Sequence, residues 1–208
     1  MLNPKLAVGE VGTISGRGTL ATERIEKGEL LWELDPNASV ISLAEWQSLP
    51  RESKRRYSQC AEDTLFLNTD VEYAWNHSCN PNGGSSEGSR IVALRAIQPG
   101  EEITFDYGFH EIVPTWSMLC ACGSAKCRRI VSNKDYLLRE LQTRYADHIP
   151  PYIQRAIERA RMWDTIYHTA SSRLRRMRFR LFGTASLPPP LSWLAMLYRS
   201  VQGSLRLL

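Results

Sequence analysis

The sequence predicts a mainly β domain followed by an α-helical C-terminal extension. Up to about residue 107, short apolar segments are separated by turns that contain glycine or proline, a spacing typical of strands. After residue 134, apolar residues recur at every third or fourth position, which is the period of an amphipathic helix. The composition, 43% hydrophobic and 23% charged over 208 residues, fits one compact domain with appended structure.

Individual elements of the β domain follow from local patterns. Residues Lys5 to Glu33 alternate in the manner of strands, with a tight turn at Glu26–Glu29. Ser42 followed by Glu45 forms a capping-box pattern, which predicts a helix over residues 42–58 that Pro50 divides. Further strands are expected at residues 65–67, 71–75, 91–97 and 102–107.

Helices are expected in the C-terminal part. Residues 134–146 carry leucines on one helical face, and a second helix is expected to begin at Pro150–Pro151, because proline is favoured at the first helical position. Residues 173–182 are a basic amphipathic stretch that fits a helix or a strand, and residues 191–208 fit a last apolar helix.

Charge divides the chain into an acidic and a basic part. Residues 1–150 contain 16 Lys and Arg against 20 Asp and Glu, whereas residues 151–208 contain ten Arg against two acidic residues. The arginines of residues 173–182 alternate with apolar side chains, which suits contact with nucleic acid or an anionic membrane. A solvated tail or a helix packed on the domain explains the same pattern equally well.

The chain shows no signature of a membrane-spanning or secreted protein. It has no apolar run of the ~20 residues that a spanning helix needs, and its first residues lack the pattern of a signal peptide. Five cysteines, an odd number, argue against a disulfide framework. These features predict an intracellular, reducing compartment, the nucleus or the cytoplasm if the source is eukaryotic.

The cysteines point to a metal site. Cys120, Cys122 and Cys127 lie within eight residues, so their thiolates can face one Zn²⁺ ion, which prefers four soft ligands in a tetrahedron. Cys79 and Cys60 are both candidates for the fourth ligand, and spacing does not choose between them. The alternative interpretation is that these are ordinary reduced cysteines in a loop.

Four segments in a fixed order carry a family resemblance. They are Gly16-Arg17-Gly18, the polar turn Asn76-His77-Ser78-Cys79-Asn80-Pro81-Asn82, the strand Glu102–Tyr107, and the cysteine cluster Cys120–Cys127. Together they resemble the signatures of SET-domain protein-lysine methyltransferases that carry a post-SET zinc segment. The resemblance covers about residues 5–133.

The resemblance implies a fold and a division of the chain. The family has a β-clip fold in which the segments around Asn76–Cys79 and Glu102–Tyr107 thread together as a pseudoknot. Residues 1–115 would form the SET domain, residues 116–133 the post-SET zinc segment, and residues 134–208 the helical, arginine-rich extension. The family also implies S-adenosylmethionine as methyl donor, with the substrate lysine entering through a channel on the opposite side.

Site residues follow from the resemblance, position by position. Tyr107 would be the catalytic tyrosine and would also contact the methyl donor. The other donor-binding residues would be Gly16, Arg17, Gly18, Asn76 and His77. The structural Zn²⁺ ion would be held by Cys79, Cys120, Cys122 and Cys127, which leaves Cys60 as a free thiol.

Some positions suggest finer properties of the site. Phe105 stands where a phenylalanine in the family leaves room for more than one methyl group, and Trp116 and Leu119 are candidates to cover the adenine or the lysine channel. Residues 73–75 are Tyr-Ala-Trp where many members have Arg-Phe-Ile, and Arg128-Arg129 stands where Arg-Gly is common.

The sequence therefore predicts a zinc-containing enzyme that methylates lysine in a protein substrate, a histone or another basic protein. The acidic balance of residues 1–150 suits such a substrate. The alternative is a catalytically inactive SET-like protein-interaction module. A zinc-stabilised nucleic-acid-binding protein is a weaker option, because it would need basic residues around the cysteine cluster.

Overall fold

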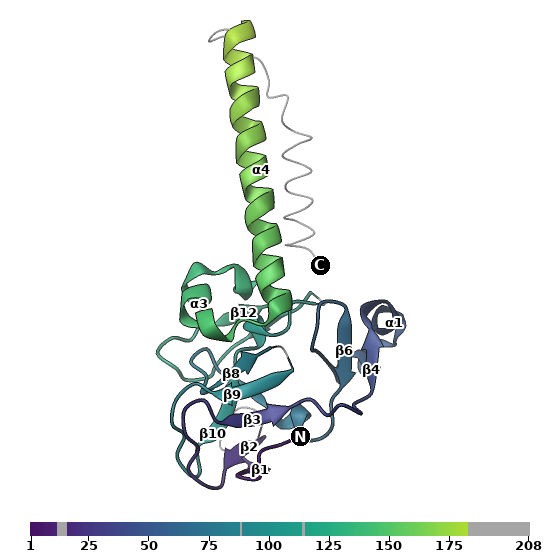
Figure 1. The fold of residues 1–208 in the computed structure, drawn as a ribbon, viewed down its shortest axis with the longest axis vertical. Helices are drawn as coiled ribbons and strands as arrows, with labels where there is room; N and C mark the ends of the chain where they lie inside the picture. Colours follow the sequence, from purple (N-terminus) through teal and green to yellow (C-terminus); the bar gives the residue numbers. More distant parts are fainter. Residues whose placement is uncertain (12–15, 88, 114, 183–208) are drawn as a thin grey trace. The chain divides into compact units, whose positions relative to one another are not determined.

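The computed structural model describes residues 1–11, 16–87, 89–113 and 115–182 (Figure 1). The chain divides into two compact units, Met1–Gln154 and Arg155–Leu208, and the second is described up to Phe182. All of the predicted site residues lie in the first unit.

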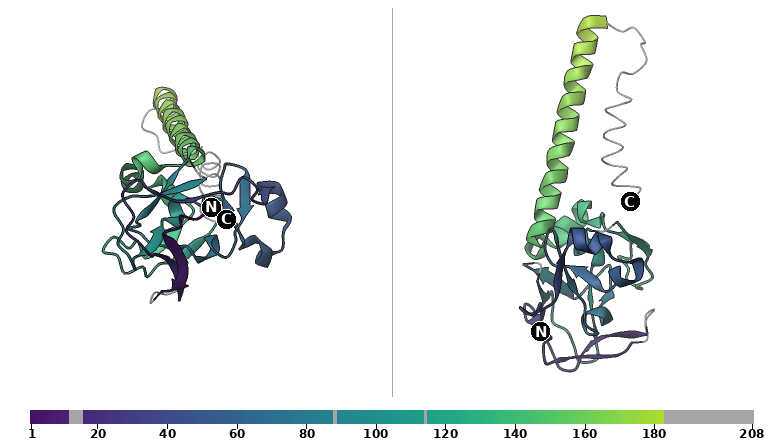
Figure 2. Two further views of the ribbon diagram at one scale, coloured as in Figure 1. Left: turned by 60° about the horizontal axis from the view of Figure 1, so that its bottom comes forward. Right: turned by 90° about the vertical axis from the view of Figure 1, so that its right-hand side faces the viewer.

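Four small sheets make up the first unit (Figures 1 and 2). The four-stranded sheet has the order β1-β2-β10-β7 and is formed by β1 (Leu6–Glu10), β2 (Arg17–Ala21), β10 (Glu102–Phe105) and β7 (Asn76–His77). One three-stranded sheet has the order β3-β9-β8, formed by β3 (Leu30–Glu33), β9 (Arg90–Ala93) and β8 (Gly83–Ser86). The other has the order β4-β6-β5, formed by β4 (Val40–Ser42), β6 (Thr64–Leu67) and β5 (Tyr57–Gln59). A hairpin of β11 (Ser117–Leu119) and β12 (Ile130–Ser132) completes the set. The mainly β class predicted from the sequence is confirmed.

The hydrophobic core joins the sheets. Ile25, Leu31, Ile97 and Ile103 are fully buried in one apolar cluster. An isolated antiparallel bridge pairs Ile25 with Ile97, so the core also ties together two turns that lie outside the strands. Burial of such side chains is the main free-energy gain that holds several short strands in one unit.

The helical segment after residue 42 is shorter than the pattern predicts. The capping box is present, with Glu45 N–H donating to Ser42 Oγ, and Pro50 separates α1 (Leu43–Ser48) from α2 (Arg51–Lys54). The chain then forms β5 instead of continuing as helix to residue 58. Figure 1 shows α1, β4 and β6 grouped at one edge of the unit.

The strand expected at residues 71–75 is wrong, because this segment is a 3-10 turn, η1 (Glu72–Ala74). The Glu72 carboxylate accepts hydrogen bonds from the Thr69 N–H (2.8 Å), the Thr69 hydroxyl and Trp32 Nε1 (2.7 Å). These bonds fold the chain back on itself, which a strand cannot do. The tertiary contact with Trp32 thus overrides the local strand preference.

The strand predicted over residues 102–107 ends at Phe105. Asp106 caps the following 3-10 turn, η2 (Tyr107–Phe109), by accepting a hydrogen bond from Gly108 N–H at 3.1 Å. The strand expected at 91–97 is also shorter, since β9 ends at Ala93. Tyr107 therefore projects from a turn and not from a ladder of paired strands.

Helices follow the last hairpin, as expected. The expected helix at residues 134–146 is broken into η3 (Asp135–Leu137) and α3 (Arg139–Arg144), and the next turn is η4 (Ala146–His148). The long helix α4 (Pro151–Phe182) begins at the predicted proline. The predicted helix at 191–208 lies outside the described residues. None of the described helices has the length and apolar content needed to cross a bilayer.

Glu72→Gln should destabilise the fold in a pH-dependent way. Although burial raises the pKa of Glu72, its bonds to Thr69 and Trp32 lower it below the ordinary value. A lowered carboxyl pKa adds stability above pH ~4.3, which is lost as the pH falls through the folded-state pKa. Urea denaturation should show a loss of about 1–3 kcal/mol at pH 7.

The same comparison at a pH below the folded-state pKa of Glu72 should show a smaller difference between variant and wild type. The control is Glu23→Gln, which changes an exposed carboxylate. An equal loss at both pH values would contradict an ionised, hydrogen-bonded Glu72.

Candidate active site and metal centre

The candidate site is organised by the parallel pairing of β7 with β10. Asn76 lies opposite Thr104 and His77 opposite Phe105. β10 is in turn paired with β2, which contains Arg17 and Gly18. Three segments that are far apart in the sequence therefore meet in one sheet, and the predicted donor-binding residues are brought together.

Gly18 lies where no larger residue fits. A Cβ atom at this position would be 2.5 Å from Glu102 Oε1 and 3.0 Å from Asn76 Nδ2. Asn76 Nδ2 donates to the Arg17 carbonyl at 2.8 Å and to Glu102 Oε1 at 2.6 Å. The asparagine thus fixes the backbone around Gly18, and the missing side chain of Gly18 leaves room for the Asn76 and Glu102 side chains beside it. Gly16 has a φ of +69°, which glycine adopts without strain.

Tyr107 is held at both ends. Its hydroxyl donates to the Trp75 carbonyl at 2.5 Å, and its backbone N–H donates to His77 Nδ1 at 3.2 Å. Its ring packs against Phe105, with 4.9 Å between the ring centroids. Burial, with a smaller contribution from the nearby Glu111 and Glu102 carboxylates, raises the pKa of Tyr107, so the phenol stays protonated at neutral pH.

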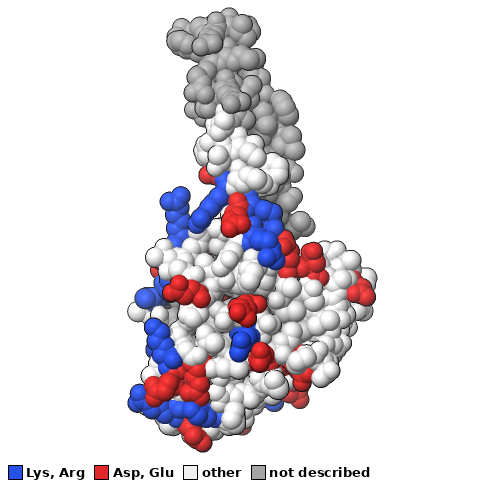
Figure 3. All heavy atoms as spheres, viewed as in Figure 1, with Lys and Arg blue, Asp and Glu red and all other residues white. Residues whose placement is uncertain are grey.

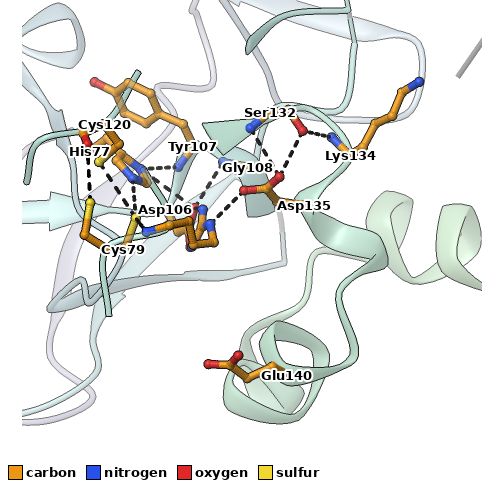
Figure 4. Close-up of polar contacts among 12 residues, drawn as sticks. His77, Cys79, Asp106, Tyr107, Gly108, Cys120, Ser132, Lys134, Asp135 and Glu140 are labelled. Carbon is orange, nitrogen blue, oxygen red and sulfur yellow. Dashed lines mark hydrogen bonds and ion pairs between the residues drawn. The ribbon is translucent and has the colours of Figure 1, made fainter. Parts of the chain in front are cut away.

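His77 connects Tyr107 with the cysteines (Figure 4). Burial lowers the pKa of His77 to about 4, so the imidazole is neutral. Because Nδ1 accepts the Tyr107 N–H, the ring proton is assigned to Nε2, which lies 3.3 Å from Cys79 Sγ. The imidazole can then donate to the sulfur of Cys79.

The structure selects Cys79, and not Cys60, as the fourth member of the cysteine cluster. The Sγ atoms of Cys79, Cys120, Cys122 and Cys127 all lie within 4.8 Å of one another, and this is the only such group found among the described residues. Cys60 Sγ instead faces the Thr64 carbonyl at 3.5 Å, and burial raises the pKa of this thiol.

The four cysteines fit Zn²⁺. Cys79 Sγ and Cys120 Sγ are 3.8 Å apart, which matches the edge of a tetrahedron with Zn–S bonds of about 2.3 Å. Burial raises the pKa of Cys79 and Cys120, whereas hydrogen bonds from the backbone N–H groups of Cys79 and Ser124 overcome burial at Cys122 and lower the pKa of this thiol to about 7. The donor set and its backbone hydrogen bonds suit a structural zinc site.

A network of charges that the sequence analysis missed lies beside the cluster (Figure 4). Arg128 donates to both carboxylate oxygens of Asp106 and to Asp135 Oδ2, each at 2.7 Å. Tyr145 Oη donates to Asp106 Oδ2 at 3.0 Å. In the sequence, the one indication of this network is that Arg128 directly follows a cysteine of the cluster. Its partners Asp106 and Asp135 are 22 and 7 residues away, and no pattern in the sequence connects them to Arg128.

A small, partly open cavity adjoins Phe105. Aromatic rings form much of its wall, together with polar side chains; the lining residues are Trp32, Ser58, Phe66, Asn68, Glu72, Trp75, Ile91, Phe105 and His110. Within the described part of the chain, three buried polar atoms of this lining have no hydrogen-bond partner: Asn68 Oδ1, Trp75 Nε1 and His110 Nδ1. The cavity thus combines apolar walls with a few polar side chains, the composition typical of a ligand site.

Trp116 and Leu119 do not line this cavity. Trp116 packs on the cysteine cluster and donates from Nε1 to the Glu111 carbonyl at 3.1 Å. Leu119 is 87% exposed on the β11–β12 hairpin. Their expected role as a cover for the adenine or the lysine channel remains a prediction.

Comparison with known proteins identifies the domain. The family model of the SET domain matches residues 16–108, which include Gly16–Gly18, the Asn76–His77 segment and Tyr107. Residues 16–108 belong to the SET domain family. The cysteine cluster that follows this SET domain is consistent with a post-SET zinc site.

Histone-lysine N-methyltransferases are relatives of this SET domain. The chain is 37% identical to ash1 of Drosophila melanogaster over 86 residues, which is 38% of the chain and 4% of that protein. It is 32% identical to trithorax of Drosophila virilis over 135 residues, 57% of the chain and 3% of that protein. An H3 lysine-4 specific enzyme of Neurospora crassa is 46% identical over 126 residues, 53% of the chain and 10% of that protein.

The chain spans only a small part of the curated relatives it matches, between 2% and 16% of their lengths. The similarity therefore concerns the SET domain, and it leaves the other regions of those proteins without a counterpart in the comparison.

Replacing a cluster cysteine should remove bound metal. Cys122→Ser takes away the thiol with the lowered pKa, and three remaining sulfurs make a weaker Zn²⁺ site. Mass spectrometry of the native protein purified with zinc should show one ion for wild type and for the matched control Cys60→Ser, and none for Cys122→Ser. Full zinc content in Cys122→Ser would exclude the four-cysteine site.

Proposed function

We propose that this SET domain transfers methyl groups from S-adenosylmethionine to the ε-amine of lysine in a basic protein of the histone class. The observation that carries the proposal is the position of Tyr107, which is locked by two hydrogen bonds next to the Gly18–Asn76 pair. The relationship to histone-lysine N-methyltransferases supports this reaction and this substrate class. If the substrate is a histone, the site of action is the nucleus.

The residues that would hold the methyl donor are Gly16, Arg17, Gly18, Asn76 and His77. When bound, S-adenosylmethionine supplies an electrophilic methyl group on a sulfonium. Gly18 leaves room for the Asn76 side chain, and Asn76 keeps the Arg17 carbonyl in place. A preformed backbone surface of this kind binds without the entropic cost of ordering a loop.

Tyr107 would position the reacting groups. Its hydroxyl proton is committed to the Trp75 carbonyl, so the oxygen presents its lone pairs in a fixed direction. Because the pKa of the phenol is raised, this oxygen does not act as a base at neutral pH. Its contribution is orientation and electrostatic stabilisation, and the proton of the lysine ammonium must leave to water.

The cavity beside Phe105 is the proposed entrance for the lysine side chain. Its rings, among them Trp32 and Trp75, suit an alkyl chain that ends in a cation. Desolvation in this cavity, and a positive charge on the donor, both favour the neutral amine that attack requires. Phe105, in place of a tyrosine, supports transfer of more than one methyl group.

The net charge supports a basic substrate. Residues 1–150 have four more acidic than basic side chains. On the face shown in Figure 3, the acidic and basic side chains of the described residues are interspersed. Substrate choice would then depend on the residues that surround the cavity.

The basic stretch 173–182 lies within α4, so the helical alternative predicted for it is confirmed. A role of this stretch in binding nucleic acid or anionic lipid remains a proposal. An inactive, protein-binding SET module is the alternative function, and the two experiments below distinguish it from an enzyme.

Binding of S-adenosylmethionine should depend on Asn76 and Gly18. Isothermal titration into zinc-loaded protein should give micromolar affinity for wild type and no detectable binding for Asn76→Ala or Gly18→Ala, because the first frees the Arg17 backbone and the second places a Cβ atom against the Asn76 and Glu102 side chains and displaces them. Tyr107→Phe should largely retain binding. Absence of binding to folded wild type would favour the interaction module.

Tyr107→Phe should lower methyl transfer by about 10²–10³-fold, the usual cost of removing one preorganised polar group. The assay uses core histones, and mass spectrometry counts the methyl groups on each lysine. Tyr73→Phe is the matched control, because this tyrosine is 55% exposed. Monomethyl-lysine as the sole product at long times would refute the proposed role of Phe105, and equal rates in both variants would refute that of Tyr107.

A further inference from the structure

We propose that Arg128 is a positioning residue that couples the geometry of the four-cysteine cluster to the orientation of Tyr107. The inference rests on the proposed function, because it concerns the tyrosine assigned to methyl transfer. Two sets of contacts support it: the backbone of Arg128 contacts the cysteine cluster, and its side chain contacts Asp106 next to Tyr107.

The backbone of Arg128 belongs to the cysteine cluster. Its N–H donates to Cys79 Sγ at 3.3 Å, and its neighbour in the chain is Cys127. A metal-bound thiolate is a strong acceptor, so closure of the four cysteines around Zn²⁺ fixes the position of this N–H. The start of the Arg128 side chain is then set by the cluster.

The guanidinium of Arg128 holds two buried carboxylates. It binds Asp106 with two parallel hydrogen bonds and Asp135 with a third, all at 2.7 Å. The side chains of Arg128, Asp106 and Asp135 are only 14%, 3% and 11% exposed. A planar fork with fixed N–H directions defines the orientation of the Asp106 carboxylate in a way that an ammonium cannot.

The orientation of the Asp106 carboxylate affects Tyr107 through the turn η2. It directly precedes Tyr107, and its Oδ1 atom caps the turn η2 by accepting the Gly108 N–H at 3.1 Å. Rotation of the carboxylate would release this cap and with it the turn from which the Tyr107 ring projects. His77 provides a second connection, from Cys79 Sγ to the Tyr107 N–H. Arg128 is the connection that also neutralises buried charge.

The test compares Arg128→Lys with the matched control Arg129→Lys in the zinc-loaded 208-residue chain. The lysine keeps a positive charge between the two aspartates, so the fold and the zinc content should be retained. Arg129 is exposed, and the same change there should have no effect. Amide hydrogen exchange of Tyr107 and Gly108, measured by NMR, should be about tenfold faster in Arg128→Lys, because the η2 turn opens more often.

Turnover should fall with little change in donor affinity. Arg128→Lys should lower kcat for histone methylation about tenfold or more, whereas titration with S-adenosylmethionine should give a near wild-type Kd. In Arg128→Ala, added guanidinium ion at millimolar concentration should restore part of the activity, and methylammonium should not. Rescue by the planar cation alone separates positioning from a general effect on folding.

Tyr145→Phe is a second variant that removes no buried charge. It deletes only the hydroxyl that donates to Asp106, so it should fold and should raise the exchange rates of Tyr107 and Gly108 by a smaller factor. The proposal would be overturned if the amide hydrogen exchange rates of Tyr107 and Gly108 in both Arg128→Lys and Tyr145→Phe, each folded and zinc-loaded, equalled those of wild type.

The outcomes separate this inference from the proposed function. If wild type transfers no methyl group but Arg128→Lys still accelerates exchange at Tyr107, the enzymatic proposal fails and the coupling stands. If wild type methylates histones and Arg128→Lys does so at the same rate with unchanged exchange, the coupling fails and the enzymatic proposal stands.

Discussion

The parallel pairing of β7 with β10 is the constraint on which the candidate site depends. Only two residues of each strand take part, Asn76 and His77 against Thr104 and Phe105. The pairing nevertheless decides which groups meet, because Asn76 reaches the Arg17 carbonyl and His77 reaches the Tyr107 N–H. So short a ladder cannot be stable alone, and the turns on both sides must be held by other contacts.

Two groups of polar contacts hold these turns. On one side, the Glu72 carboxylate binds Trp32 and the turn before β7. On the other side, Cys79 follows β7 and joins the thiols of the hairpin segment, while Arg128 reaches back to Asp106 after β10. Buried charges of this kind add little net stability when complete but are costly when one partner is lost, which makes them effective at fixing one geometry.

Departures from the family pattern have local physical explanations in two cases. Arg129, which stands where glycine is common, adopts a φ of +65°, a left-handed conformation that costs a residue with a Cβ atom about 1 kcal/mol. Trp75 stands where isoleucine is common, and its ring packs edge-on against Phe105 at 5.9 Å. Trp75 thus enlarges the aromatic wall of the cavity.

The sequence by itself determined the elements whose signals are local. The capping box at Ser42, the helix start at Pro151 and the cysteine cluster depend on neighbours within a few residues, and each was predictable. Tertiary structure decided the rest. It brought Cys79 to the other three cysteines, as the family resemblance implied and cysteine spacing alone did not. It also turned the expected strand at 71–75 into a 3-10 turn and assembled Arg128 with Asp106, because hydrogen bonds and charge pairs between distant residues produce no periodic pattern in a sequence.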